Sequence, residues 1–91
     1  MKKNGRMALF LKEKRVKAGL TQSDVAQKLG YSSPQFISNW ERGLASPPVF
    51  VLRDLTKIYK VAADEMFNLL VNDVKENLKK EFYATKGRRR V

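Results

Sequence analysis

The chain has 91 residues, of which 43% are hydrophobic, so we expect one small folded domain and not two. It contains no cysteine and no histidine, which excludes disulfides, thiolate zinc sites and histidine-based catalysis. Lys and Arg number 19 against 9 Asp and Glu, and the resulting net charge of +10 indicates a polyanionic partner.

The positive charge is concentrated at the two ends of the sequence. Residues 1–20 carry a net charge of +6, residues 75–91 carry +5, and the stretch between them carries −1. Basic ends on a nearly neutral body favour nucleic acid as the partner. There are two alternatives: the partner is an anionic membrane surface, or the charge serves only to keep the protein soluble.

Helical segments follow one another along the chain, and no stretch shows sustained strand alternation. A first helix is predicted from about Arg6 to Ala18, ending before Gly19. A second begins with a capping box, in which Thr21 is the N-cap and Asp24 is at N3, and it ends at Gly30.

A third helix is predicted over 34–42, with Ser33 as its N-cap and Pro34 in its first turn. The proline pair at 47–48 starts a fourth helix that runs to about Tyr59. A fifth runs over 63–83 and is followed by a frayed basic tail at 86–91. The predicted fold is all-α: a compact bundle of five helices, with a helix-turn-helix formed by the second and third and an extended last helix.

The third helix has two distinct faces. At 100° per residue, Phe36, Ile37 and Trp40 share one arc, which is typical of a core face. The opposite arc carries short hydrogen-bonding side chains and one cation, namely Gln35, Ser38, Asn39 and Arg42. Gln and Asn can bond an adenine edge bidentately in the major groove, Ser can bond several base edges, and Arg can bond guanine or phosphate. The pattern favours a base-reading helix, although so short a helix can also show two such arcs by chance.

Two segments resemble the lambda-repressor-like (Cro/Xre-type) helix-turn-helix family. They are residues 15–30, with Gly19-Leu20-Thr21-Gln22 at their centre, and Ile37-Ser38-Asn39-Trp40-Glu41-Arg42-Gly43. The likeness covers roughly residues 7–70 and implies four to five short helices, duplex DNA binding and, usually, a dimeric transcriptional regulator. Between Gly30 and Glu41 this chain has one residue more than the commonest family pattern, which lengthens the turn before the third helix.

The resemblance implies roles for individual residues. For base reading we expect Gln35, Ser38, Asn39 and Pro34. For phosphate contacts we expect Thr21, Gln22, Ser33, Arg42, Gly43 and Ser46. The free N–H groups at the start of the second helix agree with a phosphate there, whereas Thr21 and Ser46 can also be simple helix caps. An ion pair between Arg15 and Glu41 is expected to join the first and third helices.

The remaining apolar and basic residues have mainly structural interpretations. Predicted core residues are Leu11, Leu20, Val25, Ala26, Leu29, Ile37, Trp40, Leu52, Leu55, Val61 and Phe67. Trp40 could stack on a base, but its phase opposite the polar arc favours the core. A basic cluster forms either an arm along the DNA backbone or an ordinary solvated helix face, and it consists of Lys2, Lys3, Arg6, Lys12 and Lys14.

An apolar stripe continues along the fifth helix beyond the part that the family's domain needs. Its members are Phe67, Leu70, Val71, Val74, Leu78 and Phe82. We predict that Val74, Leu78 and Phe82 form a homodimer interface, with Phe50 and Val51 as further candidates. A fold-back within a monomer, or the docking of another protein, are the alternatives. The chain then divides into a DNA-binding domain with a basic arm, 1–70, and a helical extension with a basic tail, 71–91.

The predicted function is a sequence-specific, double-stranded-DNA-binding transcriptional regulator that acts as a repressor on a palindromic operator. The alternative is an antitoxin-like or adaptor protein whose main partner is another protein. The carboxylates are scattered without metal-ligand spacing, so we expect no enzyme activity, no cofactor and no metal site. No apolar run is long enough for a membrane span, and Met7–Leu11 is too short for a signal-peptide core. We therefore expect a cytoplasmic protein that is nucleoid-associated when bound to DNA.

Overall fold

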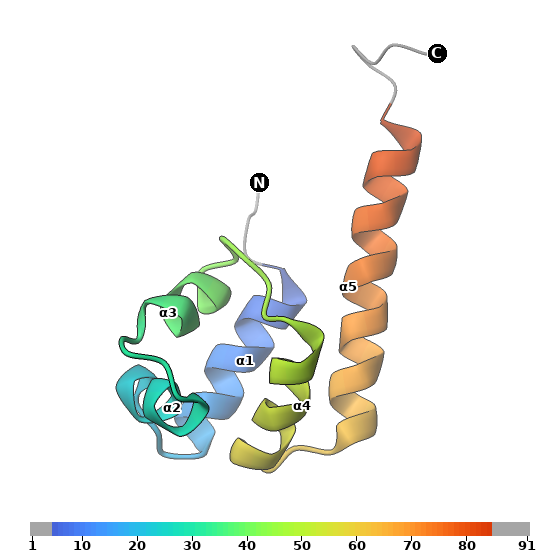
Figure 1. Ribbon diagram of the computed structural model, residues 1–91. Coiled ribbons are helices and arrows are strands. Elements are labelled where there is room, and N and C mark those ends of the chain that lie inside the picture. Colours follow the sequence, from blue (N-terminus) through green and yellow to red (C-terminus); the bar gives the residue numbers. More distant parts are fainter. Residues whose placement is uncertain (1–4, 85–91) are drawn as a thin grey trace.

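The computed structural model describes residues 5–84, which form five helices in succession (Figure 1). The helices are α1 (Arg6–Lys17), α2 (Gln22–Leu29), α3 (Gln35–Glu41), α4 (Val49–Ile58) and α5 (Ala63–Tyr83). No strand occurs in this part of the chain, so the all-α prediction is confirmed. No helix within 5–84 is both long enough and apolar enough to cross a membrane. The predicted tail at 86–91, and Lys2 and Lys3 of the predicted arm, lie outside the described residues.

The start of α2 is the predicted capping box. The Thr21 hydroxyl accepts a hydrogen bond from the Asp24 amide at 2.9 Å, and the Thr21 amide donates to the Asp24 carboxylate at 2.9 Å. The bonds from Thr21 hold the pKa of the exposed Asp24 carboxyl below its usual value. Two of the backbone donors at this helix end are therefore satisfied from within the protein.

The starts of α3 and α4 differ from the prediction. Pro34 is the N-cap of α3 and not its first helical residue, and the Ser33 hydroxyl accepts a 3.3 Å hydrogen bond from the Gln35 amide without being the cap itself. Pro48 is the N-cap of α4, so the capping role considered for Ser46 is wrong. In both cases proline stands just before the first helical residue, where its missing N–H costs nothing.

Four helices end in the same hydrogen-bonded turn, in which one residue with positive φ follows the helix. In each turn that residue and the next donate their amides back to the last helical turn, as in Val61 N to Thr56 O at 3.0 Å. After α1, α2 and α3 the positive-φ residues are Gly19, Gly30 and Gly43. After α4 the residue is Lys60, with a φ of +55°, and no other non-glycine residue of 5–84 has a positive φ.

The strained backbone at Lys60 gives a testable expectation for stability. Lys60→Gly should raise the free energy of unfolding by about 0.5–1 kcal/mol, because a left-handed conformation strains any residue that carries a Cβ. Urea denaturation followed by circular dichroism measures the change. The control is Lys12→Gly in the middle of α1, where glycine should lower stability by about 0.5–1 kcal/mol. A loss of stability in Lys60→Gly would contradict the expectation.

The core lies between α1, α2, α3, α4 and the first turns of α5. Its buried members are Met7, Leu11, Val25, Ala26, Ile37, Trp40, Val51, Leu52, Leu55, Tyr59 and Met66. The predicted core residues Leu20, Leu29 and Val61 are partly buried and pack against this cluster. Trp40 is 4% exposed, so its assignment to the core is confirmed.

Three apolar residues lie differently from the prediction. Phe67 is not in the core: it is 61% exposed, because Met66, one position earlier on α5, faces the other helices instead. Val51 belongs to the core and not to an exposed surface, whereas Phe50 beside it is 63% exposed. Phe36 is 54% exposed and packs against the ring of Tyr31, with the ring centroids 4.9 Å apart.

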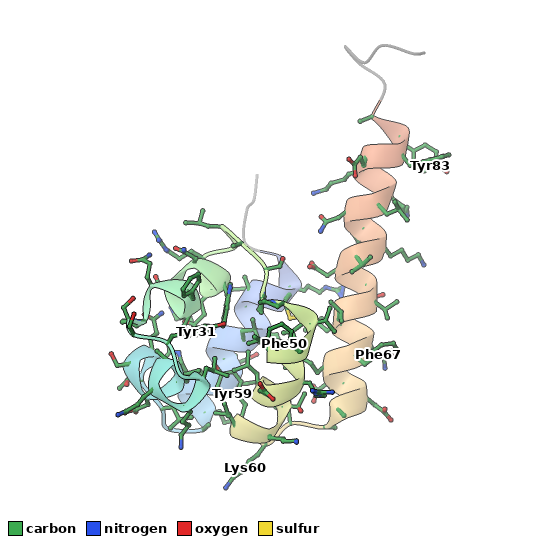
Figure 2. The ribbon with its side chains drawn as sticks, in the orientation of Figure 1. Tyr31, Phe50, Tyr59, Lys60, Phe67 and Tyr83 are labelled. Carbon is green, nitrogen blue, oxygen red and sulfur yellow. The ribbon has the colours of Figure 1, made fainter. Side chains whose placement is uncertain are left out.

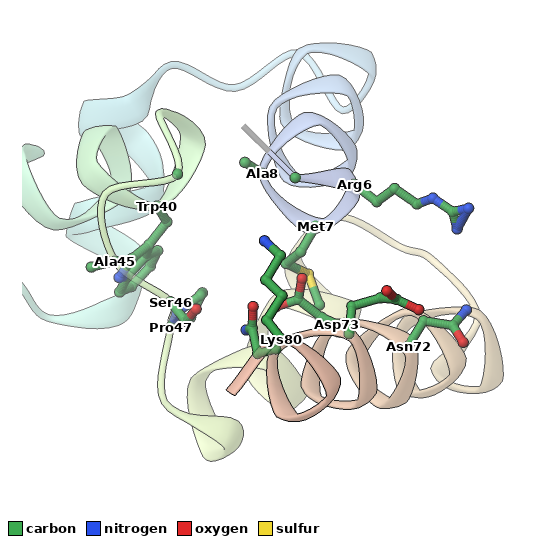
Figure 3. Close-up of a pocket in the computed structure, with 14 residues that line it drawn as sticks. Arg6, Met7, Ala8, Trp40, Ala45, Ser46, Pro47, Asn72, Asp73 and Lys80 are labelled. Carbon is green, nitrogen blue, oxygen red and sulfur yellow. The ribbon is translucent and has the colours of Figure 1, made fainter. Parts of the chain in front are cut away.

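Helix α5 packs against α1 and α4 with its first half only, and its second half extends past the other helices (Figure 1). A polar cavity of about 450 Å³ separates this second half from the start of α1 and the loop after α3 (Figure 3). The side of α5 that lines the cavity carries Asn72, Asp73, Glu76, Asn77 and Lys80. The polar side of α5 therefore faces the body of the protein.

The apolar stripe of α5 points to solvent. Val74, Leu78 and Phe82 are 55%, 63% and 73% exposed. Tyr83 also projects away from the other helices (Figure 2). The alternative of a fold-back that buries the stripe within a monomer is therefore wrong for the described residues, because the stripe and the cavity-facing residues occupy opposite sides of one helix.

Candidate nucleic-acid interface

Helix α3 is held in place by its inner face. Ile37 and Trp40 are 1% and 4% exposed, and α3 contacts both α1 and α2. The longer turn before α3 is anchored by Tyr31, whose ring lies 6.0 Å from that of Trp40, measured between centroids. The sequence analysis missed this contact, although an apolar residue directly after Gly30 occupies the position that commonly packs back on a helix ending in this way.

The outer face of α3 carries a row of polar side chains joined by hydrogen bonds. Gln35 Nε2 donates to Asn39 Oδ1 at 3.0 Å, and Arg42 Nη2 donates to the same oxygen at 3.2 Å. Gln35 and Arg42 are exposed, and Asn39 and Ser38 are half-buried. These two bonds leave the side-chain oxygen of Gln35, the side-chain N–H groups of Asn39 and most of the N–H groups of the Arg42 guanidinium available to a ligand. The structure thus brings three of the predicted contact residues together.

A buried ion pair joins α3 to α1, as predicted. Arg15 Nε lies 2.7 Å from Glu41 Oε2, and Arg15 Nη2 donates to Glu41 Oε1 at 3.0 Å. The two side chains are only 12% and 3% exposed. The hydrogen bond to Glu41 raises the pKa of Arg15 above its usual value, so the guanidinium stays charged. Burial next to this pair also raises the pKa of the Tyr59 hydroxyl, which stays neutral.

The same carboxylate holds Gln22, the predicted phosphate-contacting residue at the start of α2. Gln22 Nε2 donates to Glu41 Oε1 at 3.0 Å, and the residue is half-buried. This bond fixes the Gln22 side chain while leaving its carbonyl oxygen, a second amide hydrogen and its backbone N–H free. Sequence reasoning did not anticipate the contact, because the two residues are 19 positions apart and Glu41 was assigned to Arg15 alone.

The other predicted phosphate residues lie around the ends of α2 and α3. Thr21 is exposed at the start of α2, and Ser33 is exposed in the turn before α3, next to the half-buried Pro34. Gly43 and Ser46 are exposed in the loop after α3, and this loop forms one wall of the polar cavity (Figure 3). Of these residues, Ser33 is tied to the row on α3, because its hydroxyl accepts the bond from the Gln35 amide, and the assignment of all of them to phosphate contacts stays a prediction. No cluster of acidic side chains within 5–84 is arranged to hold a metal ion.

A short helix, a turn and a second short helix with a buried inner face and a polar outer face define a helix-turn-helix protein. A helix-turn-helix family model matches residues 11–66, and the chain belongs to this family. It is also similar to the HTH-type transcriptional regulator ImmR of Bacillus subtilis (strain 168), with 32% identity over 85 residues. That match covers 78% of this chain and 66% of the relative, so the chain corresponds to slightly less than two thirds of ImmR.

The buried ion pair makes Glu41 a sensitive position. Glu41→Ala should lower the free energy of unfolding by about 3 kcal/mol, because it leaves the part-buried Arg15 guanidinium without its counter-charge. Chemical denaturation measures the loss. The matched control is Glu13→Ala on the exposed side of α1, where the change should stay within about 0.5 kcal/mol. Equal effects of the two substitutions would show that the pair does not stabilise the fold.

Proposed function

We propose that this protein is a sequence-specific transcriptional regulator that binds duplex DNA through α3 and represses transcription by occupying its operator. The observation that carries the proposal is the hydrogen-bonded row of Gln35, Asn39 and Arg42 on the outer face of a helix whose inner face is buried. The relative ImmR is named a transcriptional regulator, which supports the same function for this chain.

The size of α3 suits the major groove of B-form DNA. An α-helix with its side chains is about 10–12 Å in diameter, and the groove is about 12 Å wide and admits one helix. The A-form groove of RNA is deep and narrow, so duplex RNA does not fit such a helix. The side-chain oxygen of Gln35 and the amide hydrogens of Asn39 supply an acceptor and donors, the two kinds of group that bond an adenine edge.

Phosphate contacts flank the row on α3 in this proposal. The start of α2 offers the backbone N–H groups and the fixed side chain of Gln22, and the loop after α3 offers Gly43 and Ser46. These contacts position the protein without reading sequence. The net charge of +10 adds attraction that weakens steeply as the salt concentration rises.

The base-reading role of α3 can be tested with duplexes selected from a random pool. Gln35→Ala should weaken binding to the selected duplex by about 1–3 kcal/mol and relax the preference at one or two base pairs. The control Gln27→Ala, an exposed glutamine of α2, should leave both unchanged. Wild-type affinity should exceed that for random duplex at least about a thousandfold at physiological salt. Equal affinity for all sequences would refute the proposal.

The exposed stripe on α5 supports a homodimer as the form that binds DNA. Burial of three side chains of the size of Val74, Leu78 and Phe82 contributes about 1.5–3 kcal/mol each. Residues 71–84 carry three acidic and three basic residues, so two copies of this segment do not repel each other. Two-fold pairing would place two α3 helices about one DNA turn apart, which matches a palindromic operator.

Dimerisation can be tested with a charge placed in the stripe. Leu78→Asp should convert a dimer into a folded monomer and weaken operator binding, because a carboxylate cannot be buried in an apolar interface without a partner. Sedimentation equilibrium and circular dichroism measure the two properties. The control Asn68→Asp adds the same charge to an exposed position of α5 outside the stripe and should remain dimeric. A wild-type protein that is monomeric at tens of micromolar and binds the operator as tightly as Leu78→Asp would instead favour another protein as the partner of α5.

A further inference from the structure

A second surface, separate from α3, combines positive charge with an apolar floor. It is a groove of about 580 Å³ at the place where α1, α2 and α4 end. Four lysines line it, namely Lys14, Lys17, Lys28 and Lys60, and no acidic residue does. Its floor includes the partly buried side chains of Leu20, Ile58 and Val61. Lys60 projects from the lower end of α4 (Figure 2).

The backbone of Lys60 distinguishes this lysine from the other three. Lys14, Lys17 and Lys28 lie in the last turns of their helices, where a cation offsets the negative end of the helix dipole. Lys60 follows α4 in the left-handed conformation, at a position where α1, α2 and α3 each have glycine. Glycine would form the same turn without strain, so what the protein gains from Lys60 is its side chain.

We propose that this lysine-lined groove binds an acidic segment of another protein, with carboxylates paired to the lysines and an apolar side chain on the floor. Each exposed ion pair contributes little by itself, but four lysines that line one groove act on the same segment. The floor adds a contact that depends on the apolar side chain, and the volume is large enough for one such side chain and its flanking residues.

The composition of the groove favours an acidic protein segment over DNA and over a second copy of this chain. A DNA backbone carries negative charge but has no apolar side chain to contact Leu20, Ile58 and Val61. In the proposed function, DNA binds the outer face of α3 instead. A second copy of this chain carries a net charge of +10, and its extended α5 has no excess of acidic residues over 71–84. An acidic segment with an apolar residue complements both the lysines and the floor.

The test uses the full chain and a labelled twelve-residue peptide in which Glu and Asp flank a Leu-Phe pair. A second peptide of the same charge has Ser in place of Leu and Phe. Nuclear magnetic resonance should show shifts of the backbone amides of Ala18, Leu20 and Val61 on titration with the first peptide. Fluorescence anisotropy should show binding below about 1 mM that weakens at least about fivefold with the serine peptide and as salt rises from 50 to 300 mM.

Two variants locate the contact. Lys60→Gly keeps the turn and should weaken peptide binding at least about fivefold, whereas Lys75→Ala removes the same charge from α5, outside the groove, and should bind like wild type. Both should bind the selected duplex through α3. Absence of peptide binding, equal binding of Lys60→Gly and wild type, or equal binding of the serine peptide would overturn the proposal. The proposal would also be overturned if the selected duplex displaced the peptide and shifted the signals of the same backbone amides. The groove would then be a DNA-binding surface.

Discussion

The buried carboxylate of Glu41 determines how α1, α2 and α3 meet. It lies at the end of α3 and accepts three hydrogen bonds, two from Arg15 and one from Gln22. A charged group with a 3% exposed side chain is tolerated only when its partners replace the water that it has lost. Because those partners come from α1 and α2, displacement of either helix would leave the charge unpaired, and the angle of α3 relative to both is fixed.

The orientation of the polar face of α3 follows from this constraint. A helix of seven residues is too short to be stable alone, so packing of Ile37 and Trp40 and the bonds of Glu41 must hold it. Once these three residues point inward, Gln35 and Asn39 must point outward. The bond from Gln22 to Glu41 also ties the proposed phosphate-contacting position to the same carboxylate, so the groups proposed to read bases and to anchor the protein share one rigid support.

The sequence predicted the parts of the fold that local rules determine. Capping residues and terminal glycines predicted the bounds of the helices to within one or two residues. The angular positions along α3 assigned Trp40 to the core face and Gln35 to the outer face. The phase of α5 was harder to predict, because Met66 and Phe67 are both apolar and only tertiary packing decides which of them is buried. Val51 and Phe50 present the same ambiguity on α4. The bond between Gln22 and Glu41 could not be predicted, since it depends on the angle between two helices that no local pattern encodes.

The two surfaces outside the core differ in how they can influence DNA binding. In the proposed dimer the stripe on α5 acts through geometry: pairing two chains would set the distance between two α3 helices without changing either one. The lysine-lined groove acts through charge, because four lysines are a large share of a net charge of +10. An acidic partner there would neutralise part of the field that attracts phosphates, while the hydrogen-bonding groups on α3 stay as they are. Non-specific binding depends on that field almost entirely, whereas operator binding also depends on base contacts. A partner in the groove would therefore release the protein from random DNA more readily than from its operator.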